Sequence, residues 1–214
     1  MAKVTLSFDN GPDPETTGAV LDALARQNLR ATFFLIARKL GDPGARRLAE
    51  RARAEGHWIG NHTLNHEVAL GCMDDETTIT AEIDGAQSVI GSLAEPERLF
   101  RPFGEGGVIN SRLLGARAYA RLVAGRYTCV LWNSVPRDWE DPVGWAARAR
   151  ADCAGRAWSL LVLHDTEAAM ARQLDRFLGT MCDDGHDIVQ EFPPDCVPLR
   201  RGSLLFTIEG IIPP

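Results

Sequence analysis

Five short segments of this 214-residue chain contain side chains that can do acid–base or metal chemistry. They contain aspartate, histidine, asparagine or arginine, each follows a predicted β-strand, and they span residues 7–12, 61–66, 100–104, 137–139 and 163–165. The active site of an α/β barrel is built at the C-terminal ends of its strands. We therefore expect the five segments to meet at one active site.

The most specific local pattern is the pair His62 and His66. On a helical turn, side chains at positions i and i+4 face the same way, and neutral imidazole is the commonest protein ligand of zinc and similar ions. An isolated pair at this spacing is more typical of a solvated helix face. Three of the five histidines, these two and His164, lie within the five segments, and this favours a metal or catalytic site.

Asp9 ends a predicted buried strand and is followed closely by a Gly-Pro turn. A carboxylate held there can act as a general base on a hydrolytic water, provided that a neighbour controls its pKa. The alternative is an aspartate that caps a turn or the helix predicted over residues 15–27. Asp13 is better placed for the cap, which leaves Asp9 free for chemistry.

His164 follows the apolar run 160–163, so a mostly buried strand would bring a titratable ring to the expected active site. Asp138 and Trp139 belong to another of the five segments. Alone, they would be typical of a surface acid beside a packed aromatic ring. Within this series of segments, they are candidates for the same site as His164.

The predicted elements alternate between strands and helices. Apolar runs bounded by Gly, Pro or Asn predict strands over residues 3–8, 31–36, 57–60, 99–101, 128–132, 160–164 and 187–192. Helical periodicity predicts helices over residues 15–27, 45–55, 75–93, 110–124, 142–154 and 167–182. This alternation implies a parallel sheet. Seven such units predict an α/β fold, an irregular, incomplete (β/α)7 barrel. The alternative is a doubly wound open sheet, but the first strand lacks a phosphate-binding G-x-G-x-x-G.

The composition indicates one domain, residues 1–214, because 45% hydrophobic residues can bury a full core. The net charge of −6 gives no basic surface for nucleic acid, and the longest apolar runs are too short to span a membrane.

No secretory signal is visible, so a cytoplasmic location is expected. Five cysteines without a C-x-x-C pair argue against a disulfide framework and a zinc-thiolate site.

Together the five segments resemble the motifs of the polysaccharide deacetylase family (NodB homology, carbohydrate esterase family 4), over about residues 4–192. The resemblance implies the same irregular barrel and a hydrolase of non-peptide carbon–nitrogen bonds. Such an enzyme would remove acetyl groups from an N-acetylated sugar or glycan with the help of a divalent metal, zinc first among the candidates.

The resemblance also implies a role for each site residue. The metal ligands would be Asn10, His62 and His66. The catalytic residues would be Asp9 as general base, Arg101 as its orienting partner, His164 as general acid and Asp138 as the residue that tunes it. The substrate-binding residues would be Trp139 and Val162, which line the acetyl pocket, and Phe103, whose backbone N–H helps to hold the oxyanion.

Two departures from the family pattern bear on activity. The family has Asp-Asp in the first motif, where this chain has Asp9-Asn10, so a neutral amide replaces a carboxylate ligand and metal affinity should fall. The third motif lacks the residue that usually separates the arginine from Pro-aromatic-Gly. Either Arg101 shifts, or Arg98 takes over part of its role.

Three functions follow from these residues. The first is a metal-assisted deacetylase, the second is a metal-independent amide hydrolase of the same fold, and the third is a non-catalytic glycan-binding protein. Retention of the full set of acid, base and histidine residues favours an enzyme. If the protein is cytoplasmic, a sugar precursor or a small amide is a more accessible substrate than an intact cell-wall polymer.

Overall fold

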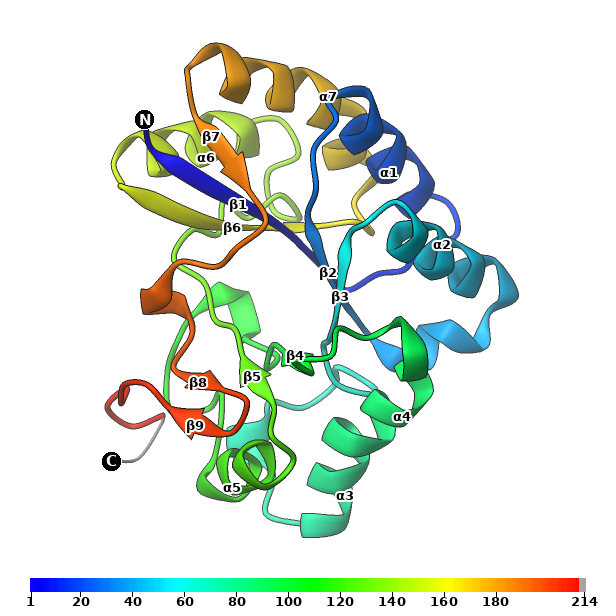
Figure 1. Ribbon diagram of the computed structural model, residues 1–214, viewed down its shortest axis with the longest axis vertical. Coiled ribbons are helices and arrows are strands. Elements are labelled where there is room, and N and C mark those ends of the chain that lie inside the picture. The colour runs from blue at the N-terminus through cyan, green and yellow to red at the C-terminus, as the bar shows by residue number, and fades with distance from the viewer. Residues whose placement is uncertain (212–214) are drawn as a thin grey trace.

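A curled, mostly parallel sheet forms the centre of the computed structural model, which describes residues 1–211 (Figure 1). The parallel strands are β1 (Lys3–Asp9), β2 (Thr32–Leu35), β3 (Trp58–Asn61), β4 (Leu99–Phe100), β5 (Thr128–Cys129), β6 (Trp158–His164) and β7 (Asp187–Val189). The antiparallel hairpin of β8 (Leu199–Arg200) and β9 (Ser203–Leu204) extends the sheet beyond β5. The strand order is β6-β1-β2-β3-β4-β5-β8-β9, and β7 pairs with β1.

Strand β1 pairs with three other strands, β6, β7 and β2. It pairs with β6 over its whole length, which sets Asp9 beside His164, and its other edge is shared by β7 and β2. Successive side chains on a strand point to opposite faces. The apolar residues of β1 therefore point outward and pack against the helices that cover the sheet. Ser7 and Asp9 point to the opposite face, into the barrel interior, where both accept hydrogen bonds from Arg101.

Helices lie around the outside of the sheet (Figure 1). They are α1 (Thr17–Arg26), α2 (Pro43–Ala54), α3 (Glu76–Thr80), a π-helical turn (Ala81–Gly85), α4 (Ala86–Ile90), α5 (Ala116–Ala124), α6 (Trp145–Ala154) and α7 (Ala168–Asp183). Short 3-10 turns occur at Ala37–Gly41, Leu70–Cys72, Gly91–Leu93, Glu105–Gly107 and Pro194–Cys196. No helix among residues 1–211 is both long and apolar enough to cross a membrane.

The barrel closes through a single bridge instead of a full strand pair. After β5 the chain bends back toward β6, where Ser134 pairs with Leu161. The Val162 N–H donates to the Ser134 carbonyl over 3.0 Å, and the Ser134 N–H donates to the Leu160 carbonyl over 3.2 Å. This geometry confirms the predicted irregular, incomplete (β/α)7 barrel and not the open doubly wound sheet.

Several predicted boundaries are wrong. The helix predicted over residues 110–124 begins at Ala116, because the Asn110 side chain accepts the Arg112 N–H in a local turn that competes with helix formation. The helix predicted over residues 75–93 is interrupted by the π turn, and its last turn is a 3-10 turn that begins at Gly91, where φ is 60°. The strands predicted over residues 99–101, 128–132 and 187–192 are shorter, and the β8–β9 hairpin was not predicted.

Candidate active site

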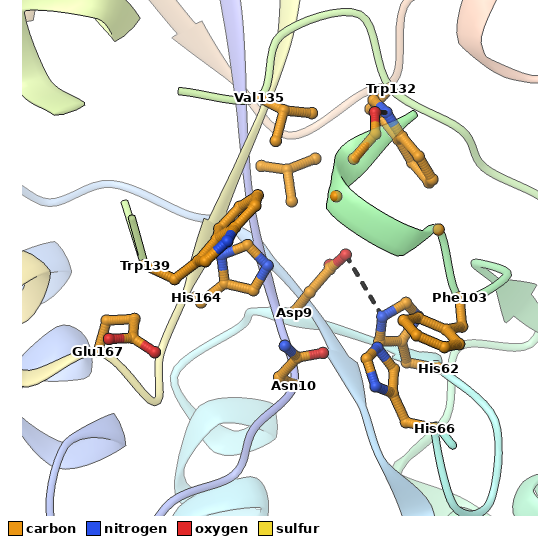
Figure 2. Close-up of a pocket in the computed structure, with 14 residues that line it drawn as sticks. Asp9, Asn10, His62, His66, Phe103, Trp132, Val135, Trp139, His164 and Glu167 are labelled. Atoms are coloured by element: carbon orange, nitrogen blue, oxygen red, sulfur yellow. Dashed lines mark hydrogen bonds and ion pairs between the residues drawn. The ribbon is translucent and has the colours of Figure 1, made fainter. Parts of the chain in front are cut away.

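A cavity of about 190 Å³ opens at the C-terminal ends of the strands (Figure 2). Eight of the ten predicted site residues line it: Asp9, Asn10, His62, His66, Phe103, Trp139, Val162 and His164. The other two, Arg101 and Asp138, are buried directly behind the cavity wall and bond to Asp9 and His164. The structure therefore brings all ten predicted residues together.

Asp9 and Arg101 form a buried ion pair at the end of β1. Arg101 Nη1 donates to Asp9 Oδ1 and to Ser7 Oγ, both over 2.8 Å, and the guanidinium lies 4.0 Å from the centre of the Phe34 ring. Burial alone would raise the pKa of Asp9, but the charge and hydrogen bond of Arg101, together with the charge of His164, outweigh burial, so this pKa is lowered. Asp9 is therefore an ionised carboxylate that can accept a proton.

Arg98 does not share this role. Its guanidinium lies over the Tyr127 ring, 4.3 Å from the ring centre, and donates to the Gly125 carbonyl over 2.8 Å. Arg98 has a positive φ of 50°, whereas Arg101 stays in register with β3, because its N–H donates to the Asn61 carbonyl over 2.9 Å. Of the two arginines, the structure therefore places Arg101 at the site.

His164 is held by both carboxylate oxygens of Asp138. Asp138 Oδ1 lies 2.8 Å from His164 Nδ1, and Oδ2 accepts the His164 backbone N–H over 2.8 Å. Burial would lower the pKa of His164, but the hydrogen bond and charge of Asp138, together with the charge of Asp9, raise the pKa above its ordinary value. The Asp138 contact at Nδ1 leaves Nε2 to carry the proton that this ring can donate.

His62 and His66 lie on an irregular turn, so the predicted helical turn is wrong. Thr63 and His66 have positive φ angles of 68° and 58°, which an α-helix does not contain. The turn nevertheless brings the rings together, with centroids 4.7 Å apart. Burial lowers the pKa of both rings, that of His66 to about 3, so both are neutral imidazoles with a lone pair available to a cation.

The tautomer of His62 is fixed by its neighbour. The Arg101 carbonyl lies 2.8 Å from His62 Nδ1, and because a carbonyl can only accept, Nδ1 carries the hydrogen. The lone pair is then on Nε2, which lies 3.6 Å from Asp9 Oδ2 (dashed in Figure 2). A water or an ion between these two atoms would contact both the candidate base and a candidate ligand.

Asn10 completes a donor set that fits a divalent cation. Its side-chain oxygen Oδ1 is buried, has no hydrogen-bond partner among residues 1–211, and lies on the side of the two histidines (Figure 2). A buried acceptor without a partner costs about 1–3 kcal/mol, which a bound cation would offset. Within residues 1–211, no three His, Cys, Asp or Glu side chains are grouped for metal binding. The candidate set is instead two imidazole nitrogens and one amide oxygen.

The remaining predicted residues form the walls of the cavity. Trp139 packs edge-on against His164, with centroids 4.8 Å apart, and Phe103 packs against His66, with centroids 3.9 Å apart. Val162 contributes an apolar surface beside them. Asp13 lies outside the cavity, where its carboxylate accepts the N–H groups of Glu15 and Thr16. It therefore caps the turn before α1 and not the helix itself, whose N-cap residue is Thr16.

Sequence reasoning missed several lining residues: Gly104, Gly106, Gly107, Trp132, Val135 and Glu167. Trp132 and Val135 come from the bent segment after β5, whose return to β6 no local pattern predicted. Glu167 could have been suspected from its place three residues after His164, just before α7 begins.

Comparison with known proteins identifies the class. The family model described as "Polysaccharide deacetylase" matches residues 2–121. A chitooligosaccharide deacetylase from Rhizobium leguminosarum bv. trifolii is 33% identical over 162 residues, which cover 76% of this chain and 71% of the relative. A peptidoglycan-N-acetylglucosamine deacetylase from Bacillus cereus is 34% identical over 181 residues, which cover 80% and 79% of the two chains. This chain belongs to the polysaccharide deacetylase family.

Solved structures agree on the fold. A structure described as "T48 deacetylase with substrate" has a TM-score of 0.70 and 27% identity, covering 88% of this chain and 87% of the other. Peptidoglycan deacetylase PdaC from Bacillus subtilis has a TM-score of 0.72 at 24% identity, with the same coverage. The family is one of carbohydrate deacetylases that generally use a divalent metal, so the chain is assigned to a class of hydrolytic enzymes.

Proposed function

We propose that this protein hydrolyses the acetamide C–N bond of an N-acetylated sugar or glycan at a weakened His/His/Asn metal site. The main support for the proposal is that a candidate general base and a candidate general acid line the same cavity. Asp9 is held ionised by Arg101, and His164 is held protonated by Asp138. Pairs of titratable groups whose environments push their pKa values apart are typical of acid–base catalysis.

The side chains supply both proton transfers of amide hydrolysis. Asp9 accepts a proton from a water molecule, whose oxygen adds to the acetyl carbonyl carbon to form a tetrahedral intermediate. His164 then donates its proton to the sugar nitrogen as the C–N bond breaks, and the products are acetate and the free amine. A divalent ion held by Asn10, His62 and His66 would polarise the carbonyl and lower the pKa of the water.

The walls of the cavity suit an acetyl group. Trp139, Val135 and Val162 present apolar surface for the methyl group, and the Phe103 backbone N–H is the proposed donor to the oxyanion. A volume of about 190 Å³ is below the roughly 300–1,000 Å³ of pockets that enclose drug-sized ligands. The cavity therefore suits the acetamido group and part of one sugar ring, with the rest of a chain outside.

The relatives suggest which sugar to test first. The two curated relatives described above are named as deacetylases of chitooligosaccharide and of N-acetylglucosamine in peptidoglycan. We propose N-acetylglucosamine units within an oligosaccharide as the substrate, and zinc as the metal. A small amide remains the alternative substrate.

Acetate release from N-acetylglucosamine oligomers tests this function. We expect release by the zinc-supplemented protein, and we expect Asp9→Asn and His164→Ala each to lower kcat by at least about 100-fold, because each removes one proton transfer. Val143→Ala, at an exposed position that is not part of the cavity lining, is the control. Release that persists after chelation would favour the metal-independent hydrolase. Binding of the oligomers without release of acetate would favour the glycan-binding protein.

A further inference from the structure

A buried carboxylate outside the cavity supports the turn that carries the two histidines. Glu82 lies in the π-helical turn between α3 and α4 and is only 5% exposed. Its Oε2 accepts the backbone N–H groups of Leu64 and Asn65, both over 3.0 Å. Its Oε1 accepts the Asn65 side-chain amide over 2.7 Å. Among the described residues, every hydrogen bond of this carboxylate is therefore with the chain between His62 and His66.

The position of Glu82 is unusual for an acid. It lies on the stripe of the helix that packs into the protein, together with Ile79, Ile83, Ala86 and Ile90. A buried carboxylate without hydrogen bonds is strongly unfavourable, and an apolar residue of similar size would pack there without that cost. The three hydrogen bonds to the turn compensate the burial, so the carboxylate and the turn stabilise each other.

The same π turn also holds the start of the histidine segment. The carbonyl of Ile83 accepts the Asn61 side-chain amide over 2.9 Å, and Asn61 Oδ1 accepts the Thr63 N–H over 2.9 Å. π turns interrupt α-helices frequently at functional sites. Ile83 and Glu82, adjacent residues of this turn, therefore bond to the beginning and to the middle of segment 61–66.

His66 depends on this support more than His62 does. His62 is anchored independently, because its backbone N–H donates to the Leu35 carbonyl over 2.9 Å and its ring bonds to the Arg101 carbonyl. His66 follows the turn and has a positive φ, and within the described part of the chain its N–H donates only to Thr63 Oγ1, over 3.1 Å. A backbone in this region persists only where its surroundings hold it.

We infer that Glu82 is a positioning residue for the candidate metal centre. It sets the place of His66 relative to His62 by fixing the two backbone amides between them, and it does not contact the ion. The inference depends on the proposed function only in that the histidine pair binds a divalent cation.

Metal titration of Glu82→Gln tests the inference without any substrate. Glutamine keeps the size of the side chain but replaces one acceptor oxygen by an NH2 group, which cannot accept from the turn. Loss of a residue that orients a metal ligand typically weakens metal binding about 10–100-fold. Calorimetry with zinc and cobalt(II) should show a loss of this size. Glu76→Gln is the matched control, because Glu76 lies on α3 with its side chain 69% exposed. The metal affinity of this control variant should match that of wild type.

Asn65→Ala provides a second variant with less risk to folding. It removes the side-chain contact to Oε1 and keeps both backbone contacts to Oε2, so we expect a smaller loss of affinity in the same direction. A folded Glu82→Gln protein with wild-type affinity would overturn the inference. If that variant does not fold, unchanged affinity in Asn65→Ala would overturn it.

The two proposals can fail separately. Wild-type zinc binding that Glu82→Gln weakens supports the role of Glu82, even if no acetate is released from any sugar. The titrations are repeated in the Asn10→Asp background, where binding should be tighter. Absence of binding in both backgrounds would overturn the role assigned to Glu82 together with the metal-dependent function.

Discussion

At position 10 the candidate metal centre has a neutral amide beside two neutral imidazoles. A carboxylate there would add a negative charge that attracts a divalent ion, whereas an amide oxygen offers only its dipole. The backbone of Asn10 is already in the left-handed region, with φ of 74°, which asparagine and aspartate both tolerate better than most residues. A single substitution can therefore change the charge of the site without changing its geometry.

Asn10→Asp should tighten zinc binding by at least about tenfold, since a charged oxygen replaces a neutral one at the same place and tenfold corresponds to only about 1.4 kcal/mol. Calorimetry of metal-free wild type, Asn10→Asp and Asn10→Ala measures the effect, and the alanine variant should bind more weakly than wild type. Equal affinities for asparagine and aspartate would contradict the account of a weakened site.

Asp138 controls the proton on His164, so Asp138→Asn should shift the pH dependence of activity. The raised pKa of His164 keeps the general acid protonated to higher pH. Without the carboxylate this pKa falls, and the alkaline limb of kcat/KM should move to lower pH, as measured by acetate release. An unchanged alkaline limb would show that another group donates the proton.

The raised pKa of His164 also makes the free energy of unfolding depend on pH. Because the folded-state pKa of His164 lies above the unfolded value of about 6.5, the Asp138–His164 contact stabilises fully below that value. The stabilisation is lost as pH rises through the folded-state pKa. Denaturant unfolding of wild type and Asp138→Asn across this range should show the difference between the two proteins shrinking toward alkaline pH.

At the scale of elements, the turn after β1 is packed against the end of β6. A Cβ atom built on Gly11 would lie 2.0 Å from Oδ2 of Asp165, a buried carboxylate that accepts a hydrogen bond from Thr17 Oγ1 over 2.5 Å. Asp165 is completely buried, and this burial raises its pKa to about 6. Glycine is required at position 11 for close approach of the turn to β6.

Gly11→Ala should therefore destabilise the protein by about 1–3 kcal/mol, as overpacking does in a well-packed interior, and should also weaken metal binding because Asn10 is the adjacent residue. Gly41→Ala is the matched control, since a Cβ there meets nothing within 4 Å. Denaturant unfolding and zinc titration measure both effects. A stable Gly11→Ala protein with normal affinity would show that the turn has room to move.

On the scale of the whole molecule, Arg101 joins distant parts of the barrel interior. Its guanidinium bonds to Ser7 and Asp9 on β1 and to the carbonyls of Val130 and Leu131 after β5. Arg101 itself is completely buried. Removing one partner of such a pair leaves the other charge buried and uncompensated.

Arg101→Met should lower the free energy of unfolding by about 3–5 kcal/mol at neutral pH. The lowered pKa of Asp9 means that the contribution of the pair is present above the unfolded pKa and is lost as pH falls through the folded-state pKa, so the defect should shrink in acid. Arg98→Met, at a residue whose side chain is 38% exposed, is the control and should cost less. Asp9→Asn added to Arg101→Met should recover part of the loss, and no recovery would argue against charge as the cause.

The family, the barrel class and the ten residues that the structure brings together at the candidate site could all be predicted from the sequence. This was possible because the buried strands are local apolar runs, and because acids, histidines and an arginine follow them within a few positions. Parallel strands then bring their C-terminal ends to one edge, so residues that are distant in sequence meet without further information.

The way in which these residues are held depends on tertiary contacts that no local sequence pattern predicts. The choice of Arg101 over Arg98, the irregular turn at His62 and His66, the closure at Ser134 and the support by Glu82 all depend on contacts between segments far apart in sequence. Backbone turns with positive φ are unfavourable in isolation, and tertiary hydrogen bonds stabilise them. A sequence pattern reports local preference, and such contacts override it.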